Sequence, residues 1–148
     1  MKSKMNLVCL VSLFAAAMGM ASTPTPVGTW RTVDPKTGLT TSYIKMIEND
    51  HILTGNVVKI FEVSGQKVTD ICHHCPNGKD GQRVLGLGII WDMHCQGSVC
   101  KKGRILDPRD GDVYHAQLSV ADDNKTMHLR GYILLPLFGR TQDWYRVA

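Results

Sequence analysis

The stretch "VYHAQLSVADDNKTMHLRGYI", residues 113–133, decides the fold class because apolar and polar side chains alternate along it. The residues that share one face on either side of a polar segment are Tyr114, Ala116, Leu118 and Val120, and then Met127, Leu129, Gly131 and Ile133. A period of two is typical of strands with one buried face. The polar segment between them, residues 122–125, has the composition of a turn. This stretch therefore predicts two consecutive strands joined by a tight turn.

Short strands separated by turn signals extend over the rest of the chain. We expect strands at residues 27–33, 39–47, 52–61, 84–91, 103–106, 113–121, 127–133 and 140–147. Residues 62–83 are predicted to form a long polar loop, and a second loop carrying cysteines is expected before residue 103. Eight strands in succession predict an all-β, eight-stranded antiparallel up-and-down barrel, because closure removes the exposed edges of a sheet. A flattened sandwich is the alternative.

The N-terminal segment, residues 1–21, has the features of a cleavable signal peptide. Lys2 and Lys4 precede an apolar run at residues 7–17, which is too short to span a bilayer, and Gly19 and Ala21 are small residues at a cleavage position. A buried helix is the alternative, but the following "STPTP" would end it. We therefore expect a periplasmic or secreted protein with one barrel domain at residues 22–148.

The charge balance argues against nucleic acid as a partner. Removing Lys2 and Lys4 from the 17 basic residues leaves 15 against 13 acidic ones, and the basic residues are scattered along the chain. No other stretch is long and apolar enough for a transmembrane helix in the mature chain.

The first and last strands carry the motifs Gly28-Thr29-Trp30 and Trp144-Tyr145-Arg146. Together they resemble the lipocalin and wider calycin pattern, which implies that Gly28, Trp30 and Arg146 close one end of the barrel. A longer set of segments resembles the bacterial exported family known as domain of unknown function 2147. These segments are "GTWRTVDPKTG", "LTGNVVKI", "CHHCPNGKDGQRVLGLGII", "GRILDPRDGDVYHAQL", "LRGYI" and "GRTQDWYRV". The resemblance implies a lipocalin-like barrel that binds small apolar ligands.

Four cysteines remain after signal cleavage, namely Cys72, Cys75, Cys95 and Cys100. An exported compartment favours disulfides, although the neighbouring histidines keep a zinc site open and C-x-x-C is also a redox motif. Chain entropy favours pairing across the two loops, which would close about 24 residues and stabilise the fold by about 3.4 kcal/mol. The resemblance implies the local pairs instead. We expect disulfides and no bound metal.

The predicted function is binding of a small, largely apolar molecule inside the barrel. The candidate ligand-binding residues are Tyr43, Val58, Tyr114, Leu118, Leu129 and Tyr132. No set of catalytic residues can be placed from the sequence and no cofactor is implied, so we do not expect an enzyme. Two alternatives are an interaction module of the cell envelope with a filled barrel and, less favoured, metal handling through the Cys/His loops.

The apolar segment "LLPLF", residues 134–138, stands where a polar turn is expected. It is either a loop folded over the end of the barrel or an exposed apolar surface that contacts lipid, ligand or a second subunit, which leaves a homodimer open.

Overall fold

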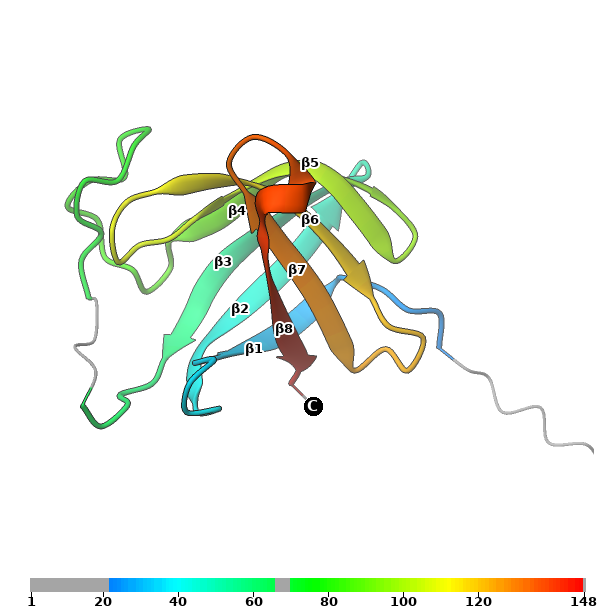
Figure 1. The fold of residues 1–148 in the computed structure, drawn as a ribbon, viewed down its shortest axis with the longest axis horizontal. Helices are drawn as coiled ribbons and strands as arrows, with labels where there is room; N and C mark the ends of the chain where they lie inside the picture. Colours follow the sequence, from blue (N-terminus) through cyan, green and yellow to red (C-terminus); the bar gives the residue numbers. More distant parts are fainter. Residues whose placement is uncertain (1–21, 66–69, 148) are drawn as a thin grey trace, which may run out of the picture.

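The computed structural model describes residues 22–65 and 70–147 of the chain, and these residues form one closed antiparallel β-barrel (Figure 1). The strands are β1 (Gly28–Val33), β2 (Thr40–Asn49), β3 (Ile52–Ile60), β4 (Gly88–Gln96), β5 (Val99–Leu106), β6 (Val113–Val120), β7 (Thr126–Tyr132) and β8 (Arg140–Arg146). The described residues also contain a single 3₁₀ turn, η1 (Pro136–Phe138), between β7 and β8. The predicted eight-stranded up-and-down barrel is confirmed. The predicted signal peptide, residues 1–21, lies outside the described residues.

Each strand pairs with its successor, and β8 pairs with β1 to close the ring. This last seam is short, because only Trp30 with Arg146 and Arg31 with Tyr145 are in register across it, whereas six residue pairs join β7 to β8. The other residues of β8 pair with β7 alone. No helix among the described residues has the length and hydropathy needed to cross a membrane.

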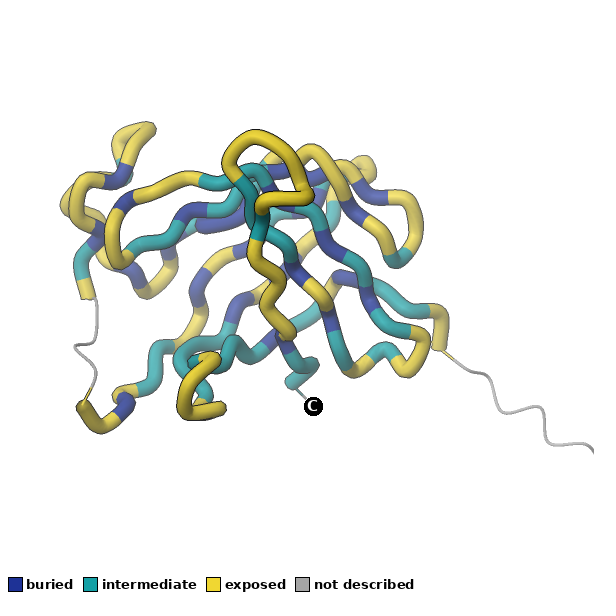
Figure 2. Tube along the Cα trace, in the orientation of Figure 1, coloured by how far each residue is buried: buried dark blue, intermediate teal, exposed yellow. Residues whose placement is uncertain are grey.

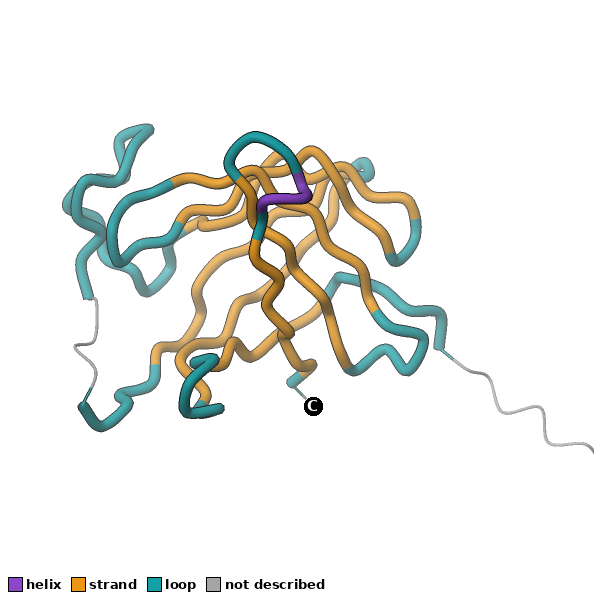
Figure 3. The backbone as a smooth tube through the Cα atoms, in the orientation of Figure 1, coloured by secondary structure: helices purple, strands orange, loops and turns teal. Residues whose placement is uncertain are grey.

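In this up-and-down topology, successive connections alternate between the two ends of the barrel. The turns after β2, β4 and β6 lie at one end with the start of β1 and the end of β8, and we call this the closed end. The loops after β1, β3, β5 and β7 lie at the other, open end (Figure 3). The open end carries the longest connection, residues 61–87.

Large side chains fill the interior nearest the closed end. The fully or almost fully buried ones include Trp30, Ile44, Met46, Leu53, Ile90, Met93, Met127 and Trp144. Two glycines leave room for two of the methionines. A Cβ at Gly55 would lie 2.6 Å from the Met46 sulfur, and one at Gly103 would lie 2.7 Å from Met93 Cβ. The closed half of the barrel is therefore packed.

Trp30 and Arg146 form the base of this packing. The indole is fully buried and its Nε1 donates a hydrogen bond of 2.8 Å to the Pro26 carbonyl. The Arg146 guanidinium lies 4.2 Å from the ring centroid, so the two groups form a cation–π pair. Gly28 is required beside them, because it has a φ of +130° and a Cβ there would lie 2.5 Å from Arg146 Nη1. The structure thus brings the three predicted closure residues together.

The same guanidinium ties three segments of chain to the closed end. It donates hydrogen bonds to the backbone carbonyls of Thr25 (2.5 Å), Val27 (2.9 Å) and Asn124 (2.6 Å), and also to the Asn124 side chain (2.7 Å). Burial lowers the pKa of Arg146 from its ordinary value, yet an arginine keeps its charge throughout the range in which proteins are folded. Arg146 therefore joins the chain before β1, the turn after β6 and β8 itself.

The fourth and fifth strands differ from the prediction. They extend to Gln96 and start at Val99, so Cys95 and Cys100 lie opposite each other in a hairpin rather than in a loop. The polar residues that suggested a loop, such as His94 and Gln96, alternate with buried ones and point outward. The hairpin turn is only Gly97-Ser98, with a positive φ of 61° at Gly97.

We expect Arg146→Ala to lower the free energy of unfolding by about 3 kcal/mol, because four accepting oxygens lose a charged donor. Urea unfolding followed by tryptophan fluorescence measures the change. Arg31→Ala is the matched control, since Arg31 makes a comparable cation–π contact to Tyr145 on the outer wall and should cost under about 1 kcal/mol. Equal losses in the two variants would contradict the role assigned to Arg146.

Candidate binding site at the open end of the barrel

The inward-facing residues of the open half are accessible to solvent, in contrast to those of the closed half. Trp144 and Gln142 lie on the same face of β8, and Trp144 is buried whereas Gln142 and the next inward residue, Arg140, are exposed. The inward residues of this half that are only half-buried are Thr32, Ser42, Ile60, Ile105, Tyr114 and Gly131, whereas Ile90, in register with Ile105, is buried. The inward surface is therefore partly accessible in the open half and covered in the closed half.

The inward residues of the open half combine apolar walls with a few polar groups. Ile60 and Ile105 are partly buried and pack against the core. Thr32 and Ser42 share a hydrogen bond of 2.7 Å between their hydroxyl groups. The Gln142 side-chain oxygen accepts a hydrogen bond of 3.2 Å from Trp144 Nε1, and its amide nitrogen keeps two N–H groups that can donate. Such a surface suits a ligand that is mostly apolar and has one polar group.

Tyr114 supplies a phenol at the rim of this surface. Burial raises its pKa, and the negative charges of Asp110, Asp112 and Asp107 raise it further. Its hydroxyl donates to Asp112 Oδ2 at 3.4 Å. The phenol therefore remains protonated well above neutral pH, and its oxygen is available as a hydrogen-bond acceptor while its hydrogen is directed to Asp112.

The loop after β5, residues 107–112, is held in a fixed conformation beside Tyr114. Burial alone would raise the pKa of the Asp107 carboxyl, but the hydrogen bonds and charge of Arg109 outweigh it and lower that pKa. The pair is bidentate, with Arg109 Nη2 2.5 Å and Nε 2.9 Å from the carboxylate. Within the loop, the Asp107 N–H also donates a hydrogen bond to the Asp112 carbonyl, and the Gly111 N–H donates one to the Asp107 carbonyl.

The Cys72–Cys75 segment packs directly against this loop. Gly111 lies so close to the backbone carbonyls of His73 and His74 that a Cβ at this position would overlap them, and its φ is +82°. Backbone hydrogen bonds of 2.9 Å from Cys72 to Gln82 and of 2.8 Å from Gly81 to Cys72 stabilise the segment. The connections after β3 and β5 are thus in contact at the open end.

The four described cysteines form two disulfides, which confirms the disulfide prediction. Cys72 pairs with Cys75, and Cys95 pairs with Cys100 across the β4–β5 hairpin, with Cα atoms 5.8 Å and 4.0 Å apart. This is the local pairing that the family resemblance implied. All four sulfurs are consumed, and no cluster of three or more His, Cys, Asp or Glu side chains able to hold a metal occurs in residues 22–65 and 70–147.

The structure separates the six predicted ligand-binding residues into two groups. Tyr114, Leu118 and Leu129 point inward, and the two leucines are buried beneath the accessible surface. The other three, Tyr43, Val58 and Tyr132, lie on the outer wall, so an interior site does not contain them.

The contacts of these three residues agree with an outer position. Tyr43 packs edge-on against Phe61 at 4.8 Å, and Tyr132 stacks on His115 at 5.4 Å. Val58 is 44% exposed where β3 has an extra residue opposite β2. Because successive strand residues alternate between faces, the position of this bulge decides which residues point inward.

Sequence reasoning missed most of the accessible inward surface, including Ile60, Ile105 and Gln142. Gln142 could have been found, because it lies two residues before the buried Trp144 on the same strand.

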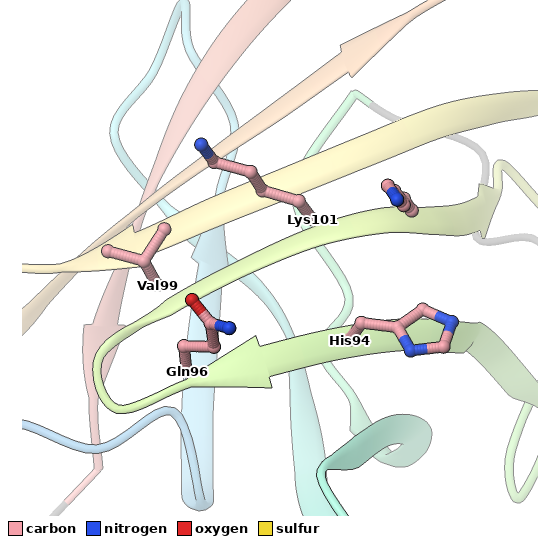
Figure 4. A pocket seen from close by; sticks show the side chains of 5 residues that line it. His94, Gln96, Val99 and Lys101 are labelled. Atoms are coloured by element: carbon pink, nitrogen blue, oxygen red, sulfur yellow. The ribbon is translucent and has the colours of Figure 1, made fainter.

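Two hollows lie on the outer wall, away from this surface. The larger, about 520 Å³, is lined by His94, Gln96, Val99, Lys101 and Lys102 (Figure 4). The smaller, about 230 Å³, is lined by Val99, Lys101, Gln117, Leu118, Ser119, His128, Arg130 and Thr141. The two share Val99 and Lys101, and neither lining contains an acidic residue.

Comparison with known proteins assigns the chain to a family. Residues 28–146 match the family described as "Uncharacterized protein conserved in bacteria (DUF2147)". The chain belongs to this family. Among solved structures, protein HP1028 from Helicobacter pylori, described as belonging to the lipocalin family, superimposes with a TM-score of 0.65 at 19% identity. The match covers 82% of each chain, and it shows that this DUF2147 protein has a lipocalin-like fold. No curated protein matches the chain.

Gly111→Ala should lower the free energy of unfolding by at least about 2 kcal/mol, because the new Cβ combines an unfavourable φ with overlap against two carbonyls. Gly38→Ala is the matched control. Its φ is +70° but nothing lies within 4 Å, so it should cost only about 1 kcal/mol. Chemical denaturation measures both, and equal costs would show that the two loops are not in contact.

In protein purified after export, the four described cysteines should give no free thiol under denaturing, non-reducing conditions and four after reduction. Alkylation followed by mass spectrometry counts them. Breaking the Cys95–Cys100 bridge should destabilise the barrel by about 2 kcal/mol, the chain-entropy value for so short a loop. Free thiols together with bound zinc would contradict the disulfide assignment.

Proposed function

We propose that this DUF2147 protein binds a small, largely apolar molecule in the open half of its barrel. The observation that carries the proposal is the change along β8, where inward-facing Trp144 is buried but inward-facing Gln142 is exposed. The ligand would rest on the packed layer that contains Leu118, Leu129 and Trp144. The lipocalin-like fold supports this role, because an eight-stranded barrel is wide enough for one small ligand.

Burial of apolar surface would supply the affinity. Ile60 and Ile105 provide apolar walls, and each Å² of ligand surface removed from water contributes about 25 cal/mol before the costs of association. The Tyr114 hydroxyl and the Gln142 amide would bond a polar end of the ligand. Since the closed half is filled by side chains, the ligand would be short or would extend beyond the rim. No catalytic step or cofactor forms part of this proposal.

We further propose that the protein acts after export to the periplasm or beyond. Two disulfides support this location, since they persist in oxidising compartments and are rare in the cytosol.

An interaction module that carries no ligand is the alternative. The closed half is already packed, and the exposed apolar residues at the β7–β8 connection favour some contact with another surface. Native mass spectrometry of the protein after incubation with a lipid extract separates the two functions. A retained small molecule supports ligand binding, whereas ligand-free dimers that grow with concentration support the module.

Gly131→Leu tests the location of the site. Gly131 faces inward between Tyr114 and Ile105, and a Cβ there would make only ordinary contacts at 3.6 Å and 3.9 Å. A leucine should therefore fill the opening without unfolding the barrel. We expect it to weaken binding of an apolar fluorescent probe at least tenfold, which is about 1.4 kcal/mol.

Lys45→Leu adds the same side chain at an exposed outer position of β2 and should leave probe binding unchanged. Unchanged binding in Gly131→Leu, with the barrel shown to be folded by circular dichroism, would place the probe elsewhere.

A further inference from the structure

The connection between β7 and β8, residues 133–138, presents an apolar surface that nothing in the described structure covers. We call it the lip. Its exposed fractions are 68% for Ile133, 82% for Leu134, 57% for Leu135, 79% for Leu137 and 74% for Phe138. Figure 2 shows the whole connection as exposed. The alternative in which this loop folds over the barrel and buries its apolar side chains is therefore not what the structure has.

The lip is held in this exposed conformation by the barrel wall. Arg130, on the outer face of β7, donates to the carbonyls of Pro136 (2.5 Å) and Leu137 (3.2 Å) and to the Thr141 hydroxyl (2.9 Å). Gly139 lets the chain return close to β7, because a Cβ there would lie 2.5 Å from the Gly131 carbonyl oxygen. Hydrogen bonds from Arg130 to the backbone of the lip thus hold the conformation in which its apolar side chains are exposed.

Positive charge continues from the lip along the outer wall. Arg130 lines the smaller outer hollow together with Lys101, and Lys101 and Lys102 line the larger one. Arg140, at the point where the lip joins β8, is also exposed, but it lies on the inward face of that strand and is not part of the outer wall. His128 in the smaller hollow pairs with the carboxylate of Asp143 at 2.7 Å. We call Lys101, Lys102 and Arg130 the basic wall.

We propose that the lip and the basic wall form a docking surface for an anionic lipid bilayer. Five apolar side chains would enter the boundary between headgroups and acyl chains, and the basic wall would lie against the phosphates. The combination of a protruding apolar segment with adjacent cations is the complement of an anionic bilayer surface. This inference rests on the outer surface alone and holds whether or not the barrel carries a ligand.

The charge of the wall argues against a second copy of the chain as the occupant. A two-fold dimer brings the same patch of both subunits together. Lips in contact would then place two basic walls near each other, and like charges at an interface oppose association. An anionic bilayer removes this repulsion and also covers the apolar side chains.

Vesicle flotation with the purified protein tests the proposal. We expect binding to vesicles of phosphatidylcholine with phosphatidylglycerol, weaker binding to phosphatidylcholine alone, and loss of the difference at high salt. The double variant Leu134→Asp with Phe138→Asp should lower the partition coefficient at least about tenfold on both vesicles. Lys101→Glu with Lys102→Glu should reduce binding to the anionic vesicles only.

Ile47→Asp with Val58→Asp is the matched control. These two residues are 45% and 44% exposed on β2 and β3, outside the lip and the basic wall, and the change should leave partition unaltered. Circular dichroism verifies that every variant is folded. Absence of vesicle binding by the folded parent protein, or equal losses in the lip and control variants, would overturn the proposal. So would a dimer in solution that the lip variant abolishes, since the second copy would then be the occupant.

Discussion

The contact between the Arg146 guanidinium and the Trp30 indole is the interaction on which the rest of the barrel depends. The ring of eight strands is joined between β1 and β8 by only two residue pairs, and one of them is Trp30 with Arg146. The same arginine bonds the chain before β1 and the turn after β6. A charged group with four acceptors over a buried ring therefore fixes the position at which the sheet closes.

Closure of the sheet at one end of the barrel leaves the start of β8 at the other end partly unpaired. Because β8 meets β1 only near its C-terminal end, its first residues are paired on one side and their inward side chains remain accessible. The interior below is packed with aromatic residues and methionine, which gives the accessible half a firm floor. The loops after β3 and β5 are in contact at Gly111, and Cys72, Val84 and Leu87 of the first loop pack into the hydrophobic core.

The fold could be predicted from the sequence because its signals are local. Alternation at residues 113–133 and the G-x-W motif identify strands whatever their neighbours are, and all eight strands exist. The inward side of each strand could not be predicted in the same way. Tyr43 and Val58 lie on the outer wall next to inward Ile44 and Val57, and the extra residue in β3 then places Ile60 rather than Lys59 opposite Ser42, which no local pattern marks. Cys95 and Cys100 were expected in a loop, yet they pair across a hairpin whose outward residues are polar.

Crystals grown with a brominated fatty acid of short chain give the most direct test of the account. Anomalous scattering locates the bromine independently of any assumption about the ligand. We expect a bromine peak inside the barrel, on the open-end side of Trp144 and between Ile60, Ile105 and Tyr114. A peak only on the outer wall, or an interior in which these side chains have closed over the floor and exclude the probe, would contradict it.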